Sequence, residues 1–164
     1  LPMDTRICSD QARFGFVFAK RGIVPEAASS WFLPRLIGIN KALELCYTGK
    51  VISAEEAKEI RLVSEILNQD KLIDRALEIA KEFTAESSQI SIALTRQMMW
   101  RMLGADDPME AHKIDSRAVF ELGQSGEAIE GVNSFLEKRP PSFPGKVSKD
   151  MPSFFPWWDE KEFE

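Results

Sequence analysis

From residue 29 onward, apolar residues recur every three or four positions, the spacing typical of amphipathic helices. The clearest stripe consists of Leu72, Ile73, Ala76, Leu77, Ala80 and Phe83. The pattern predicts helices over about residues 29–37, 40–49, 70–83, 88–103, 107–122 and 125–139, with a shorter one around Ala57. The chain is therefore expected to be mostly helical.

Residues at the ends of these segments supply start signals. Ser53 and Glu56 have the spacing of a capping box, in which each residue binds the backbone N–H of the other. Asp107 followed by Pro108 is typical of a helix start. The N–H at the first helical position has no partner within the helix, so proline, which lacks this N–H, loses no hydrogen bond there. Asn40 is expected to cap the second helix.

Two predicted helices present apolar residues that need cover. The helix over 88–103 is apolar on two sides, which predicts either deep burial or packing against a partner subunit. In the last helix, the residues expected to face inward are Ile129, Val132, Phe135 and Leu136. The apolar pattern leaves both possibilities open for the helix over 88–103.

The first third of the chain and its tail are less regular. Strand-like runs cover Met3–Ser9, Ala12–Phe18 and Val63–Leu67, and residues 22–26 are typical of a loop. The segment Pro152–Trp158 is rich in aromatic residues and proline, so we expect an extended arm whose rings pack on this subunit or a neighbouring one. A lid over a ligand site is the alternative interpretation.

Composition narrows the function classes. The 164 residues are 44% hydrophobic and 29% charged, with a net charge of −5, which disfavours a nucleic-acid groove. No apolar run is long enough to span a bilayer. Two cysteines, Cys8 and Cys46, are too few for a disulfide framework, so we predict buried thiols and a reducing compartment. The opening Leu1-Pro2, without an initiator methionine, suggests a fragment or a processed product.

One loop has residue types that suit catalysis. Glu26 lies between the apolar run Ile23–Pro25 and the small residues Ala27–Ser30, which lead into a predicted helix. Small residues let a backbone approach a ligand closely, and a carboxylate in an apolar cleft can act as a general base. The alternative is a carboxylate that only decorates a helix start. His112 is the only histidine and is expected to be structural or exposed, so a metal enzyme is disfavoured and no metal site is predicted.

Several motifs, in order along the chain, are similar to the crotonase superfamily, the enoyl-CoA hydratase/isomerase family. They are Ala12–Gly15, Gly22–Pro25, Leu33–Gly38, Tyr47–Ala57, Leu62-Val63, Glu130-Gly131 and Phe135–Arg139. Each motif is weak by itself, but together they reach to about Phe143 and are specific.

The resemblance implies an α/β crotonase-like (ClpP/crotonase) fold, of which this chain carries the last strands of a ββα spiral and a helical oligomerisation region. We expect residues 1–68 to be the end of the spiral core with an active-site loop, 69–139 the helical trimerisation region, and 140–164 the tail. The half that such proteins carry upstream would hold both N–H donors of the oxyanion hole. The chain alone is then expected to be inactive.

The resemblance also implies a substrate and site residues. The substrate would be an acyl-CoA thioester, with CoA as part of the substrate and no separate cofactor. Glu26 falls where Δ3,Δ2-enoyl-CoA isomerases of the peroxisomal type place their catalytic glutamate, and Phe18 stands where hydratases have their second one. Phe18, Val24 and Pro25 are expected to line the substrate pocket, and Lys138 to bind CoA unless it is an ordinary helix-end cation.

Double-bond isomerisation with Glu26 as base is the leading interpretation. Hydration, another crotonase reaction, and a non-catalytic CoA-binding or scaffolding relative are the alternatives. The resemblance further implies a homotrimer or hexamer, formed through the C-terminal helices. The protein would be cytoplasmic, or mitochondrial or peroxisomal in a eukaryote.

Overall fold

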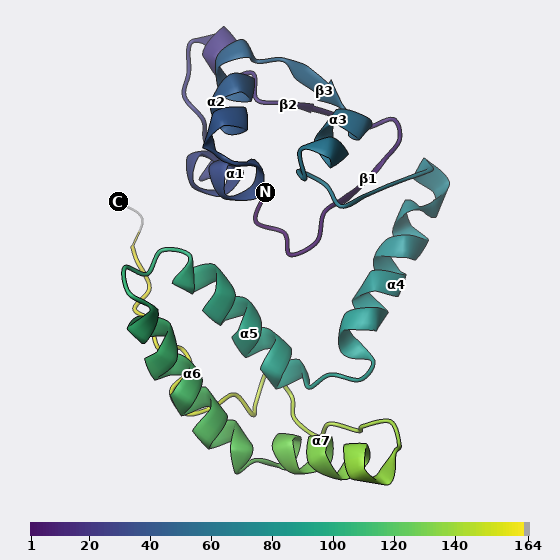
Figure 1. Cartoon of the computed structure of the whole chain (residues 1–164), viewed down its shortest axis with the longest axis vertical. Helices are drawn as coiled ribbons and strands as arrows, with labels where there is room; N and C mark the ends of the chain where they lie inside the picture. The colour runs from purple at the N-terminus through teal and green to yellow at the C-terminus, as the bar shows by residue number, and fades with distance from the viewer. Residues whose placement is uncertain (163–164) are drawn as a thin grey trace. The chain divides into compact units, whose positions relative to one another are not determined.

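Helices carry most of the chain in the computed structural model, which describes residues 1–162 (Figure 1). The α-helices are α1 (Ser29–Ile37), α2 (Ile39–Thr48), α3 (Ala54–Glu59), α4 (Leu72–Thr84), α5 (Gln89–Met102), α6 (Pro108–Gly123) and α7 (Gly126–Glu137). The strands are β1 (Ile7–Ser9), β2 (Arg13–Gly15), β3 (Val51–Ser53) and β4 (Glu65–Leu67), and two 3₁₀ turns are η1 (Ala19–Arg21) and η2 (Gln69–Lys71).

The chain divides into two units, Leu1–Ile79 and Ala80–Glu164. The first contains all four strands, as two separate two-stranded sheets. β1 pairs with β4 in parallel, and β2 pairs with β3 in antiparallel register. The predicted three-part division at residues 68 and 139 stays a prediction.

One apolar core holds the first unit together. Leu33 of α1 is 1% exposed and Leu45 of α2 is 2% exposed, and both belong to this core. The other buried members are Cys8, Ala42, Ile52, Ala54, Ala57, Leu62 and Val63. Each short strand and each of α1, α2 and α3 thus buries apolar side chains in or against the same cluster.

The helix boundaries follow from local chemistry. The predicted capping box is present: Ser53 Oγ accepts from the Glu56 N–H at 3.2 Å, and Glu56 accepts from the Ser53 N–H at 3.1 Å. Asn40 does not cap α2, contrary to the prediction. Gly38 takes that place with a φ of 79°, which favours glycine, so α2 begins directly after α1 ends.

The second unit is built on α5 and α6, with α7 following. Its small core consists of Ile90, Leu94, Ala118 and Phe154. The side of α7 expected to face inward is exposed, so that prediction was wrong for this chain. Glu127 and Ser134 are the buried residues of α7, because this side of the helix meets the segment around Phe143–Gly145.

The apolar stripe of α4 is also uncovered. The helix forms as predicted, but none of its residues is buried, and Ile73 and Leu77 are exposed. Exposed apolar faces of this kind mark contact surfaces when they are contiguous. Within residues 1–162, no helix combines the length and the apolar character needed to cross a membrane.

Candidate active site

The Glu26 loop connects η1 to α1 and is fixed through its backbone. Ser29 donates both its N–H, at 2.9 Å, and its Oγ hydroxyl, at 2.6 Å, to the carbonyl oxygen of Glu26. Ser29 is itself buried, whereas the Glu26 side chain is exposed. Within the described residues the Glu26 carboxylate has no hydrogen bond or ion pair. The loop therefore fixes the backbone of Glu26 and leaves its carboxylate oxygens available to a ligand.

Two strained residues follow Glu26. Ala27 and Ala28 have φ values of 50° and 53°, in the left-handed region that costs an L-residue roughly 1–2 kcal/mol. The turn they form places Ser29 so that it donates to the Glu26 carbonyl oxygen. Helix α1 begins directly after this turn, and Ala28 provides no side-chain cap. Strain of this kind persists only where surrounding contacts enforce it, and it clusters at functional sites.

An open apolar pocket of about 380 Å³ lies beside this loop. Val24 and Pro25, both predicted pocket residues, line one side, and Ser29 lies at the wall next to Glu26. The remaining wall residues come from η1 and its flank and from α1 and α2: Ala19, Ile23, Ser30, Leu33, Pro34, Ile39, Ala42, Leu43, Cys46 and Tyr47. A volume of this size falls within the range of small-molecule sites, roughly 300–1,000 Å³. Glu26 thus stands next to an apolar space without lining it.

Phe18 does not line this pocket. Its carbonyl oxygen accepts the N–H groups of Arg21, at 2.8 Å, and Ile23, at 3.2 Å, so its backbone holds the turn before the Glu26 loop. Ala19, the next residue, reaches the pocket instead. The role of Phe18 in a substrate pocket stays a prediction.

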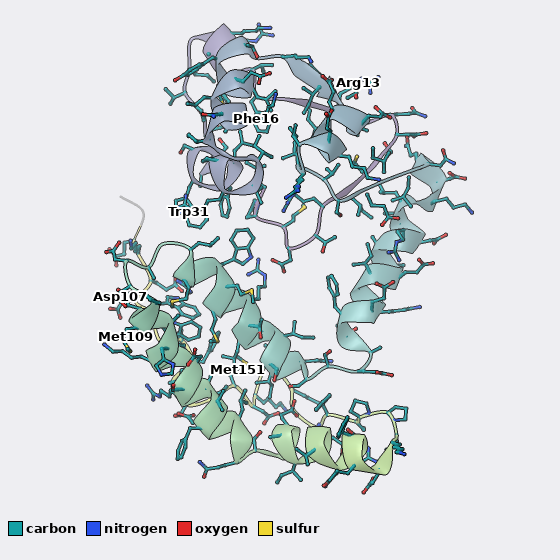
Figure 2. All side chains as sticks on the ribbon, in the orientation of Figure 1. Arg13, Phe16, Trp31, Asp107, Met109 and Met151 are labelled. Atoms are coloured by element: carbon teal, nitrogen blue, oxygen red, sulfur yellow. The ribbon has the colours of Figure 1, made fainter. Side chains whose placement is uncertain are left out.

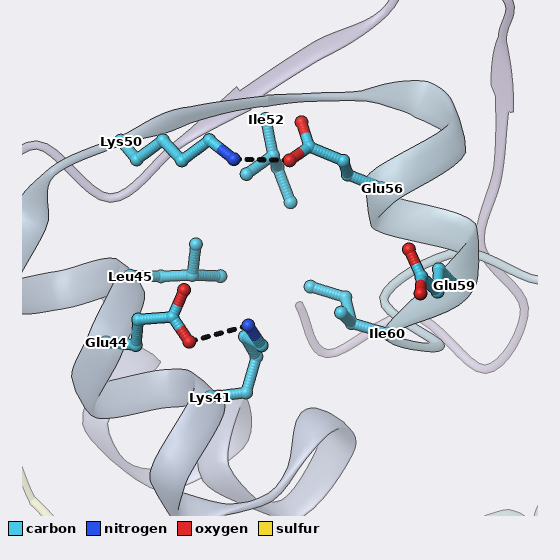
Figure 3. A pocket seen from close by; sticks show the side chains of 8 residues that line it. All are labelled: Lys41, Glu44, Leu45, Lys50, Ile52, Glu56, Glu59 and Ile60. Atoms are coloured by element: carbon cyan, nitrogen blue, oxygen red, sulfur yellow. Dashed lines mark hydrogen bonds and ion pairs between the residues drawn. The ribbon is translucent and has the colours of Figure 1, made fainter.

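A second, smaller pocket of about 150 Å³ lies among α2, β3 and α3 (Figure 3). Two ion pairs cross its polar side, Lys41 with Glu44 at 2.6 Å and Lys50 with Glu56. The Lys50 ammonium holds the pKa of the Glu56 carboxyl below its usual range. Because its lysines are already paired with carboxylates, this pocket offers less to a charged ligand than its residue types suggest.

The thiols and the histidine add no reactive group. Burial raises the pKa of both Cys8 and Cys46, which disfavours the thiolate needed for nucleophilic attack. Cys46 nevertheless lines the pocket beside Glu26. His112 is exposed and contacts Asp115 at 3.2 Å on α6. Among residues 1–162, no group of three or more potential ligands could hold a metal ion.

Lys138 lies in the second unit, at the end of α7. Its φ of 54° ends the helix, and its N–H bonds to the carbonyl oxygens of Ser134 and Phe135. The neighbouring Arg139 is held by Glu130 and Glu137, whereas the ammonium of Lys138 is exposed and makes no ion pair in the part of the chain described. Lys138 thus differs from Arg139 in having a free charge.

Sequence reasoning missed the contribution of α2 to the pocket. Leu43 was considered only as an apolar position of a helix, Cys46 only as such a position and as a buried thiol, and Tyr47 only as part of a motif. The signal was present in part, since Leu43 and Tyr47 are one helical turn apart. Which face of α2 would meet the Glu26 loop depends on the tight α1–α2 junction at Gly38, which was not foreseen.

Known proteins resemble the chain over most of its length. The family model for enoyl-CoA hydratase/isomerase matches residues 1–146. Enoyl-CoA hydratase ACTT3 of Alternaria alternata is 43% identical over 144 residues, which are 87% of this chain and 48% of that protein. The 1,2-epoxyphenylacetyl-CoA isomerase of Escherichia coli is 30% identical over 149 residues, which are 87% of this chain and 54% of that protein.

Solved structures agree with the sequence matches. An enoyl-CoA hydratase from Bacillus anthracis superposes with a TM-score of 0.80 at 32% identity, over 87% of this chain and 55% of that one. The predicted fold class is confirmed: the chain has part of an α/β crotonase-like fold. It spans about half the length of the relatives it matches, 48% in the case of the Alternaria protein.

Proposed function

The chain belongs to the enoyl-CoA hydratase/isomerase family, and on that premise we propose that its protein shifts the double bond of an unsaturated acyl-CoA, with Glu26 as the base. The observation that carries this proposal is the placement of Glu26: a carboxylate whose oxygens have no partner among residues 1–162, on a backbone fixed by Ser29, beside an apolar pocket.

One carboxylate is enough for this chemistry. In the proposed reaction Glu26 removes a proton from the α-carbon of a 3-enoyl thioester, and the electron pair moves onto the thioester oxygen. The same carboxylic acid then returns the proton to the γ-carbon, so that the double bond ends conjugated with the carbonyl and the base is regenerated. Hydrogen-bond donors must stabilise the oxyanion, and we expect them in the half of the family fold that precedes this chain.

Hydration is the second candidate, and the relatives favour it. The three relatives with 42–43% identity are named enoyl-CoA hydratases. Addition of water calls for a second carboxylate, and the position at which the family resemblance expects one is Phe18, whose ring cannot transfer a proton. A hydratase mechanism would therefore need another acid or base outside this chain.

Two further roles belong to the proposal. The exposed ammonium of Lys138 is available to a phosphate group of CoA, as a mobile point charge. The exposed apolar residues of α7, Ile129, Val132, Phe135 and Leu136, are available for subunit contacts in a homotrimer or hexamer.

The test compares Glu26→Gln with the unaltered protein in its full-length form, with 3-enoyl-CoA and 2-enoyl-CoA substrates assayed side by side. We expect isomerisation of the 3-enoyl substrate to fall by about 10²–10⁴-fold, the usual contribution of general acid–base catalysis. Glu59→Gln is the matched control, because Glu59 is exposed, lies in the same unit and has no partner among residues 1–162.

Each outcome assigns the reaction. Isomerisation that survives Glu26→Gln would rule out Glu26 as the base. Hydration of the 2-enoyl substrate, unaffected by Glu26→Gln, would establish the hydratase with its carboxylates elsewhere. No turnover of either substrate, together with retained binding of CoA, would favour a non-catalytic relative.

A further inference from the structure

The family model ends at residue 146, so the described part of the tail that lies beyond it is residues 147–162. It nevertheless supplies part of the core of the second unit. Phe154 is 5% exposed and packs with Ile90 and Leu94 of α5 and Ala118 of α6. Met151, labelled in Figure 2, is partly buried against the same cluster, as are Phe155 and Trp157.

Polar and cationic groups on both helices also contact the tail. Ser153 donates its N–H to a carboxylate oxygen of Glu121 at 3.1 Å, and its hydroxyl lies within 3.3 Å of both oxygens. The guanidinium of Arg117 lies 4.9 Å from the centre of the Phe154 ring. The guanidinium of Arg101, on α5, lies 3.3 Å from the centre of the Trp158 ring. The tail is thus bound at several points along its length.

The helices that receive the tail are incomplete without it. Of the four buried residues in this core, three belong to α5 and α6, and the fourth is Phe154. Removal of the Phe154 ring would uncover Ile90, Leu94 and Ala118 at once. The helices therefore present an apolar face, edged by Glu121, Arg117 and Arg101, on which the aromatic segment of the tail packs.

We propose that the α5–α6 face is a binding groove for an aromatic-rich extended peptide, and that residues 151–158 of the same chain are its built-in ligand. Phe154 is the anchor, and the bonds from Ser153 to Glu121 set the position of the segment along α6. The tail then works as a latch, which closes the groove in one molecule and can be replaced by the same segment supplied from outside.

The first measurement is backbone amide hydrogen exchange in the full chain. In Phe154→Ala, we expect exchange to rise by about 30-fold in residues 151–158 and in the facing part of α6, equivalent to about 2 kcal/mol at 1.4 kcal/mol per tenfold. Phe120→Ala is the matched control, since Phe120 is also on α6 but is exposed, and exchange should stay unchanged. Phe154→Leu, which keeps apolar volume, should have a smaller effect.

The second measurement adds the segment in trans. A synthetic peptide of residues 147–162 should bind the full-length Phe154→Ala chain, as measured by calorimetry. It should bind the unaltered chain at least about tenfold more weakly, because the tethered tail competes at high effective concentration. The peptide with alanine at position 154 should lose affinity about 30-fold.

Unchanged exchange in Phe154→Ala would overturn the proposal, as would a peptide that does not bind the unlatched chain. If Phe154→Ala unfolds the helices, the same two measurements on Phe154→Leu decide. Equal exchange in that variant and the unaltered chain would then show that the tail rests on the helices without closing a groove.

Discussion

The two units of the chain are stabilised in different ways. The first buries nine apolar residues in one cluster, from short strands, from α1, α2 and α3 and from the segment between α3 and β4. Its helices α1 and α2 line an apolar pocket next to Glu26. Within residues 80–162, the second has only four buried apolar residues, and one of them, Phe154, comes from the tail. Large apolar faces on α6 and α7 stay exposed.

A buried polar cluster compensates for the small apolar core of the second unit. Glu127, at the first turn of α7, is 6% exposed and has no cationic partner within residues 1–162. Its carboxylate accepts from the Ser88 hydroxyl, at the start of α5, and from the Gly145 N–H at 2.7 Å. A methyl group on Gly145 would lie 2.4 Å from Ile90 Cδ1 and 2.7 Å from a carboxylate oxygen of Glu127, so a side chain there would force these groups to move. The first unit thus depends on apolar packing, and the second on a few specific polar contacts.

The largest effect is expected from the apolar core. Leu33→Ala should lower the free energy of unfolding of the first unit by roughly 2–5 kcal/mol, because the residue is 1% exposed and leaves a cavity. Amide exchange, followed separately in each unit, distinguishes a local loss from a global one. Val119→Ala, at an exposed position of α6, is the control and should change stability by less than about 0.5 kcal/mol. Equal losses in both units would show that they unfold together, and the comparison would fail.

The second-largest loss of stability should appear only in the second unit. Glu127→Ala leaves the Ser88 hydroxyl and the Gly145 N–H without an acceptor in a buried place, which costs roughly 1–3 kcal/mol. Glu127→Gln keeps an acceptor oxygen and should cost less. The free energy of unfolding of both variants is measured by chemical denaturation, with amide exchange in α5 and α7 as the readout. Glu86→Ala, at an exposed loop residue, is the control. A loss no larger than that of Glu86→Ala would mean that the polar cluster does not stabilise the unit.

Local signals in the sequence predicted the local structure well. α1 spans Ser29–Ile37 as expected, and the caps at Ser53 and Asp107 form because their chemistry involves residues within three positions. The direction in which α7 faces could not be predicted in this way. Its apolar stripe suggested burial, whereas its packing is decided by Glu127 and by a segment 18 residues further on. Contacts over such distances leave no periodic signal.

The candidate site shows the same division. Glu26, Val24 and Pro25 were singled out because the loop sequence is unusual and resembles a family, and the structure places all three at or beside one pocket. The left-handed turn at Ala27 and Ala28 was not foreseen, since alanine carries no preference for it. Tertiary contacts enforce that turn, so it cannot be predicted from a single sequence.

The smallest effect concerns the end of α7, where a surface ion pair adds to the buried cluster. Arg139 holds Glu130 through two contacts, at 2.6 and 2.9 Å, and the Ser142 N–H adds a third at 2.6 Å. The Arg139 guanidinium, followed by this N–H, lowers the pKa of Glu130 to about 2 from its usual 4.5. Because the folded state holds the deprotonated form more strongly, the stabilisation is present above about pH 4.5 and is lost as the pH falls toward 2.

Glu130→Gln should therefore lower the melting temperature by at most a few degrees at pH 7, and the difference from the unaltered chain should vanish near pH 2. Melting curves between these pH values test this, with Glu86→Gln as the control, because Glu86 has no ion-pair partner among residues 1–162. A difference that persists at pH 2 would assign the effect of Glu130 to packing, and the contrast between a charged surface contact and a buried polar cluster would then not hold for this helix.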